Sequence, residues 1–304
     1  MNQDDDKFLI LTDKQLYERG KQHKTHRTKS REKEDKDYLP VIIKRTDEAV
    51  RHPDDILEKA IIEGYEQHCR SKLSLFISAI SAGLILGFAA MCVSFASQLF
   101  DGDNVFIQER LAMAIVYPLG FIICIMSGTQ LFTEQTATAV YPVLDKRASV
   151  FSLFSLWAIV LIGNLVGTAL SSILIASADN VIMVKQGVLE VAHHLLDHSF
   201  FEIFISAILA GWLMAQGGWL VMSTPPASSQ IICIYIVTFI IGIGGLHHSI
   251  AGSAEIFGGL IHSLDPNYYK ASKFLLASIL GNLVGGSVFV AILNYAHIRS
   301  TQEG

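Results

Sequence analysis

The chain has 304 residues, of which 51% are hydrophobic and 17% are charged, whereas a soluble chain carries charges at about a quarter of its positions. The charges are also uneven, because residues 1–72 hold 16 of the 23 Lys/Arg and 16 of the 28 Asp/Glu. These figures exclude an ordinary soluble globular domain, and no nucleic-acid-binding motif is present. They predict a polar extension followed by a membrane domain.

The N-terminal extension divides into two parts. Residues 1–52 are charged, mixed in sign and poor in aromatic side chains, so we expect a mostly disordered cytoplasmic tail. The start of the chain shows no basic region followed by an apolar core, which predicts no cleavable signal. In residues 53–72, apolar side chains recur at helical spacing after Pro53, which predicts an amphipathic interfacial helix that leads into the membrane.

Six segments meet the length of about 20 apolar residues that a membrane span needs. They are 73–98, 112–144 with a break, 150–177, 200–222, 228–260 with a break, and 271–295. The membrane domain is therefore predicted at 73–297 and a short cytoplasmic tail at 298–304. The loops after the first, third and fifth spans are acidic, whereas Lys146, Arg147 and Arg299 lie on the opposite side, so the positive-inside rule places both termini in the cytoplasm.

A repeated motif divides the membrane domain into halves. The sequence Gly-Asn-Leu-Val-Gly occurs at 163–167 and again at 281–285, and each copy follows an interrupted apolar segment, at 131–136 and at 247–252. Two halves of three spans each must enter the membrane from opposite sides. We therefore predict an all-α membrane protein with six transmembrane helices, built as an inverted 3+3 repeat with two broken helices, and a transport site at the breaks.

Polar residues gather at these two breaks. Thr133 supplies a hydroxyl at the first, and His247, His248 and Ser249 supply two imidazoles and a hydroxyl at the second. A histidine in mid-membrane is costly unless it faces a partner or water, which favours a functional role for His248. His247 fits a role or a packing contact equally well.

The same residues resemble a known family. Residues 127–136, Ser-Gly-Thr-Gln-Leu-Phe-Thr-Glu-Gln-Thr, are similar to the Leu-Phe-Thr loop of the formate/nitrite transporter family, and His-Ser-Ile-Ala at 248–251 is similar to its central histidine motif. The Gly-Asn-Leu-Val-Gly segments match its third and sixth helices. The resemblance spans about residues 55–297, and the chain resembles a divergent member of the family.

The resemblance implies an aquaporin-like fold in a homopentamer with one pore per subunit, in a bacterial cytoplasmic (inner) membrane and in contact with its lipids. It implies passage of small monovalent anions such as formate or nitrite past hydrophobic constrictions around His248, with Thr133 as the loop threonine. His248 then either relays a proton or acts only as a hydrogen-bond donor. The constriction side chains carried over by position are Tyr117, Phe121, Phe132, Met214 and Ile241.

Two carboxylates depart from the family pattern. Glu134 follows the Leu-Phe-Thr residues, and Glu255 stands seven residues after His248. If they face the pore, they repel anions unless they are neutral or paired. We favour the interpretation that they brace the breaks, through His247 or loop amides.

Transport of a small monovalent anion, proton-linked or passive, is the predicted function. A neutral-solute or cation pathway, and a non-conducting membrane scaffold or sensor, are the alternatives. No nucleophile–base pair, metal set or cofactor motif is visible in the sequence, so we expect neither an enzyme nor a bound cofactor or metal.

Overall fold

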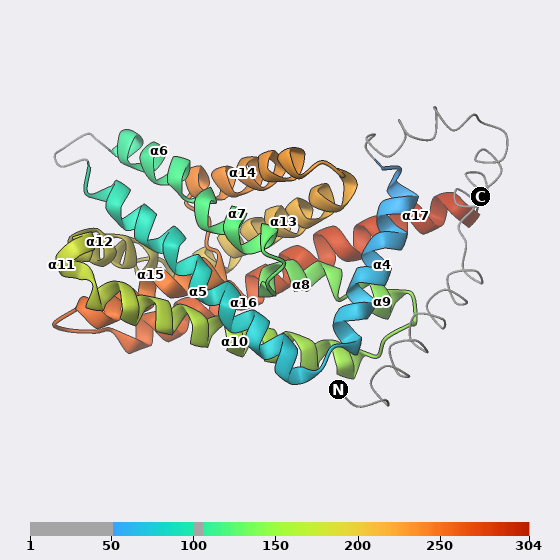
Figure 1. Cartoon of the computed structure of the whole chain (residues 1–304), viewed down its shortest axis with the longest axis horizontal. Helices are drawn as coiled ribbons and strands as arrows, with labels where there is room; N and C mark the ends of the chain where they lie inside the picture. The colour runs from blue at the N-terminus through green and yellow to red at the C-terminus, as the bar shows by residue number, and fades with distance from the viewer. Residues whose placement is uncertain (1–50, 100–105, 304) are drawn as a thin grey trace.

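The computed structural model describes residues 51–99 and 106–303, and every regular element in these ranges is a helix (Figure 1). Six helical stretches in them are long and apolar enough to cross a membrane. They are α5 (Lys72–Ser97), α6 (Phe106–Val116) with α7 (Pro118–Met126), α10 (Val150–Ser177), α13 (Phe200–Ser223), α14 (Ala227–Gly244), and α16 (Tyr268–Gly286) with its continuation. The chain is therefore an integral membrane protein.

Shorter helices connect and cover these spans. They are α4 (Pro53–Cys69), α8 (Phe132–Thr138), α9 (Tyr141–Leu144), α11 (Asp179–Ile182), α12 (Lys185–Leu196), α15 (Ser249–His262), a π-helical segment (Ser287–Ile292) and α17 (Leu293–Glu303). The tail predicted at 1–52 lies, apart from its last two residues, outside the described residues.

Glycines bring two pairs of spans into close contact, α5 with α10 and α13 with α16. A methyl group on Gly167 would lie 2.2 Å from the carbonyl oxygen of Ile80, and one on Gly285 would lie 2.2 Å from that of Ile208. Small residues permit such approach between membrane helices. The glycines thus let the backbones of these spans approach closely, and the inverted relation of the two halves stays a prediction.

Both predicted breaks are present. After α7 the chain leaves the helical conformation at residues 129–131 and resumes it in α8. After α14 it turns at Gly245, whose φ of +58° is a left-handed conformation suited to glycine, and resumes in α15. The second predicted span, 112–144, is thus four short helices rather than one helix with a gap.

Two segments differ from the sequence prediction. Residues 185–196, expected within an acidic loop, form α12, because its apolar face packs on α15 and α5, with Val188, Val191 and Ala192 buried. The last span begins at Tyr268 and stays helical to Glu303, through the π-helical segment, so residues 298–303 extend a helix instead of forming a separate tail.

Helix α4 has the predicted apolar face, and its place at the membrane interface stays a prediction. Ile56, Leu57 and Ile61 are almost fully buried, and α4 contacts α9, α13, α8 and α17. The side chain of His68 bonds the carbonyl oxygen of Ala139 at 2.9 Å and Ser152 Oγ at 2.8 Å, and burial lowers the pKa of this imidazole. The amphipathic helix therefore packs on protein through this face.

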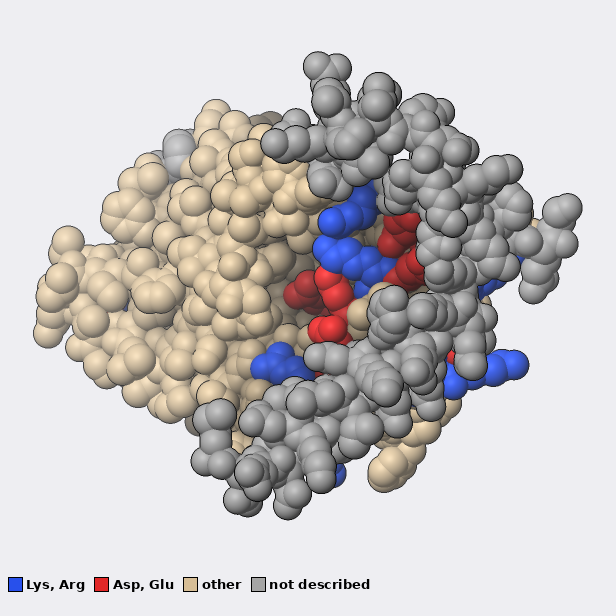
Figure 2. Space-filling view, turned by 45° about the vertical axis from the view of Figure 1, so that its right-hand side comes forward, with Lys and Arg blue, Asp and Glu red and all other residues tan. Residues whose placement is uncertain are grey.

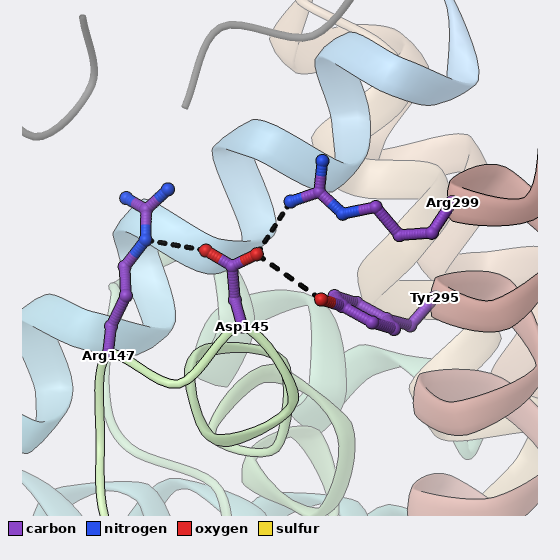
Figure 3. A network of polar contacts seen from close by, with 4 residues as sticks. All are labelled: Asp145, Arg147, Tyr295 and Arg299. Atoms are coloured by element: carbon purple, nitrogen blue, oxygen red, sulfur yellow. Dashed lines mark hydrogen bonds and ion pairs between the residues drawn. The ribbon is translucent and has the colours of Figure 1, made fainter. Parts of the chain in front are cut away.

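An ion-pair network joins the loop after α9 to α17 beside α4 (Figure 3). Asp145 accepts hydrogen bonds from Arg147 Nε and Arg299 Nη2, both at 2.6 Å, and one from the Tyr295 hydroxyl at 3.3 Å. Charged side chains gather at this end of the molecule, whereas the visible flank of the helical bundle is uncharged (Figure 2). The positive-inside rule predicted that Arg147 and Arg299 lie on the same side of the membrane, and in the structure both bind Asp145.

Candidate pore site

The two repeated asparagines hold the two breaks in the same way. Asn164 Oδ1 accepts the backbone N–H of Phe132 at 2.8 Å, and its amide donates to the carbonyl oxygens of Ala79 and Gln130. Asn282 Oδ1 accepts the backbone N–H of Ser249 at 2.8 Å, and its amide donates to the carbonyls of two further residues, Ala207 and His247. Both asparagines are fully buried. Each one satisfies backbone groups that the broken helix leaves unpaired.

The starts of α8 and α15 meet at a single hydrogen bond. His248 Nε2 lies 2.9 Å from Thr133 Oγ1, and both residues are buried. His248 is also the N-cap of α15, because its Nδ1 accepts the backbone N–H groups of Ile250 and Ala251 at 3.2 and 3.1 Å. An accepting Nδ1 places the proton of the neutral ring on Nε2, which then donates to Thr133.

The backbone amides at the second break are already satisfied. Those of Ser249, Ile250 and Ala251 donate to Asn282 and His248. The side chains at the break therefore offer the donors to a solute. The hydroxyl proton of Thr133 is one of these donors, since its oxygen accepts from His248, and in the present structure this residue is fully buried.

Aromatic side chains surround the histidine on one side. The ring of Phe121 meets that of His248 edge to face with centroids 5.1 Å apart, and Tyr117 lies 5.0 Å from Phe121. Tyr117, Ile241 and His248 line a cavity of about 180 Å³ between α5, α6, α12, α14 and α15, in the half of the molecule away from α4 and α17 (Figure 1). We refer to it as the His248 cavity.

Charged groups also line the His248 cavity. They are Glu109 and Arg110 of α6, Glu190 and His194 of α12, and Glu255 of α15. Arg110 Nη2 donates to the carbonyl oxygen of Gly244 at 2.9 Å. The pKa of His194 is lowered, first by burial and then by nearby cationic groups that include Arg110. Acidic side chains thus outnumber permanent cations along this wall.

The structure brings some predicted residues to the cavity and leaves others elsewhere. His247 turns away, with Nδ1 2.8 Å from Ser206 Oγ and its ring against His198 and Phe274, so a packing role fits it better. Ser249 is bonded to Asn282 through its backbone. Phe132 and Met214 are buried in the hydrophobic core and do not line the His248 cavity.

The two carboxylates behave differently from the expectation that they brace the breaks. Glu255 lines the cavity and is 5% exposed, and among the described residues no hydrogen bond or ion pair involves the carboxyl group of Glu255 or of Glu134. Glu134 lies in the first turn of α8, beside Gly218 of α13. Bracing comes instead from Asn164 and Asn282.

Sequence reasoning missed several members of the site. The recurrence of an asparagine between two glycines was the signal for Asn164 and Asn282. Glu190 and His194 were hidden because their segment was read as a loop, although Val188, Val191, Ala192 and Leu195 recur there at helical spacing. No sequence signal marked Glu109 and Arg110.

Broken membrane helices that meet at buried polar groups beside an apolar-walled cavity define a channel- or transporter-type membrane fold. A model of the formate/nitrite transporter family matches residues 54–296. The chain belongs to this family.

Similar proteins carry related descriptions. The inner membrane protein YfdC of Escherichia coli K12 is 32% identical over 250 residues, which cover 78% of this chain and 76% of the relative. The formate channel FocB of the same organism is 28% identical over 273 residues, covering 80% and 94%.

Two solved structures share the fold. A chain described as an FNT family ion channel superposes with a TM-score of 0.73 at 19% identity and covers 80% of this chain and 99% of its own length. A pentameric formate channel with formate bound superposes with a TM-score of 0.64 at 21% identity, covering 75% and 98%.

Proposed function

We propose that this chain is a membrane channel or transporter for small monovalent anions of the formate or nitrite type. The observation that carries the proposal is the bond between Thr133 and His248, which joins the two broken segments at the cavity. Membership of the formate/nitrite transporter family supports it. A bacterial cytoplasmic membrane, with both termini in the cytoplasm, is part of the same proposal.

The pathway rests on the cost of removing an anion from water. A charge in an apolar slit loses several kcal/mol of hydration unless donors replace the water. His248 donates to Thr133, and the Thr133 hydroxyl donates in turn to the anion. Because both groups are neutral, they stabilise the anion without a fixed cation that would retain it. Tyr117, Phe121 and Ile241 form one constriction of the pathway, and Phe132 and Met214 belong to the other.

Flux into proteoliposomes tests this function. The purified protein should pass formate and nitrite faster than protein-free vesicles do, while glycerol and rubidium stay outside. Thr133→Val keeps the shape but removes the hydroxyl, so anion flux should fall about tenfold, the equivalent of ~1.4 kcal/mol. Thr133→Ser keeps the hydroxyl and should retain most of the flux. Equal flux in the valine and serine variants would refute the role of this hydroxyl.

The oligomer is proposed from the pentameric formate channel that shares the fold. Apolar side chains of several spans, among them Phe88, Phe95, Phe151 and Phe154, are exposed on the single chain, and lipid or neighbouring subunits must cover them. Native mass spectrometry in detergent should show five chains. A monomer or dimer as the main species would contradict the proposed assembly.

A cation pathway is the second candidate. Glu109, Glu190 and Glu255 line the His248 cavity with Arg110 as its permanent cation, which favours cations by charge. Rubidium uptake without formate uptake in the same vesicles would select this candidate.

A further inference from the structure

Glu255 stands on the cavity face of α15. His248, Gly252 and Glu255 follow one another at positions i, i+4 and i+7, and all three line the His248 cavity. This spacing places residues on one face of a helix. The carboxyl group therefore lies along the same wall as the histidine, about two turns further along α15.

The carboxyl group is nearly buried and has no partner. Its residue is 5% exposed, and none of the hydrogen bonds or ion pairs of the described residues includes it. The titratable or charged groups around the same cavity are Glu109, Arg110, Tyr117, Glu190, His194 and His248. On its other side, a smaller cavity adds His262. Because an isolated buried carboxylate is costly, the neutral carboxyl is the favoured form when the cavity is empty.

The hydrogen bonds of His248 prevent it from supplying a proton to a solute, so that proton must come from another group. Its Nδ1 accepts two backbone amides and its Nε2 bonds Thr133. A second proton on Nδ1 would break the cap of α15 and place a positive charge at a helix N-terminus, where cations are unfavourable. His248 therefore serves as a fixed neutral donor. The Glu255 carboxyl group makes no such hydrogen bonds within the described residues.

We propose that Glu255 exchanges a proton with the solute in the His248 cavity, and that the pathway thereby selects anions of weak acids. This inference rests on the proposed function. The O–H bond of the Glu255 carboxyl breaks, and its electron pair stays on the Glu255 oxygen. A new O–H bond forms on an oxygen of the entering carboxylate or nitrite.

The resulting neutral acid passes the constriction at a much lower desolvation cost than the anion. The Glu255 carboxylate then takes up a proton from the bulk solution on the side from which the anion entered, delivered through the water of the cavity, so each acid that passes carries one proton across. Nitrate is a planar anion of similar size, but it is the conjugate base of a strong acid and cannot accept this proton. It remains charged at the constriction and is excluded.

Proteoliposomes that contain a pH dye test the proposal with the full-length protein. Formate and nitrate gradients are applied to the parent, Glu255→Gln, Glu255→Asp and, as the control, Asp265→Asn, which removes an exposed carboxylate in the loop after α15. In the parent and in Asp265→Asn, formate should bring protons inside, and nitrate should enter slowly. Glu255→Gln should lose proton-linked formate entry by at least about tenfold. Glu255→Asp should keep part of it, since it retains a carboxyl group.

Each outcome decides one question. If the parent protein moves no anion, the proposed function is wrong. If the parent moves formate together with protons and Glu255→Gln does so at the same rate, the proposed function stands and the inference about Glu255 is wrong. Rubidium uptake that Glu255→Gln abolishes also overturns it, in favour of a cation site. If size-exclusion chromatography shows that Glu255→Gln is misassembled, Glu255→Met provides an apolar side chain of similar length, with the same loss of proton-linked entry expected.

Discussion

The two breaks of the membrane domain share a support but differ in chemistry. Asn164 and Asn282 make the same three bonds, one accepted from the first amide of the resumed helix and two donated to carbonyl oxygens. The N-cap residues of those helices differ, since Leu131 gives α8 no side-chain cap whereas His248 caps α15. The repeat thus supplies a duplicated frame, and the solute-facing groups are specific to each half.

The largest expected effect is the loss of either supporting asparagine. Asn164→Ala or Asn282→Ala leaves one buried N–H and two buried carbonyls without their partner, at a cost of roughly 1–3 kcal/mol for each group left unsatisfied. Both variants should lower the thermal unfolding temperature in detergent, by similar amounts. A large shift for one and none for the other would show that the two breaks are not held alike.

Matched glycine substitutions should have the next largest effect. Gly167→Ala and Gly285→Ala each place a methyl group 2.2 Å from a carbonyl oxygen of the facing helix, and such overpacking costs roughly 1–3 kcal/mol. Both should reduce thermal stability less than the asparagine variants do. Gly218→Ala is the control, because the nearest atom to its added methyl group lies 3.7 Å away. Gly128 has even more space, with nothing within 4 Å, but its positive φ makes it unsuitable.

The neighbouring histidines should separate in function. His247 contacts Ser206 and lies outside the His248 cavity, so His247→Asn should change anion flux by less than about twofold, although loss of a neutral hydrogen bond should lower the stability of the protein by ~1 kcal/mol. Stopped-flow anion uptake measures this. A loss of flux as complete as that of a His248 variant would place His247 in the pathway.

Much of this arrangement could be predicted from the sequence. The apolar lengths, the repeated Gly-Asn-Leu-Val-Gly and the interrupted segments located the spans and the breaks, and the family resemblance placed Thr133 and His248 at one pore. These features are local or repeat at a regular spacing, so one sequence is enough to reveal them.

The remainder depends on tertiary contacts that have no local signature. The protein contacts of the apolar face of α4 are one example, because an apolar helix face has the same sequence pattern whether it meets lipid or protein. The residues that surround Glu255 depend on how α15 is rotated against α6 and α12. The tautomer of His248 follows from its capping of α15, which is visible only once the break has its three-dimensional shape.

The central claim is that anion passage depends on a neutral donor at His248, held by the second break. His248→Asn keeps a neutral donor and a good helix N-cap residue, so it should retain anion flux in proteoliposomes. His248→Phe offers neither donor nor cap and should abolish formate flux in vesicles. Thermal unfolding and native mass spectrometry of both variants check that assembly is preserved. A correctly assembled His248→Phe protein that conducts formate at the rate of the parent would contradict the account.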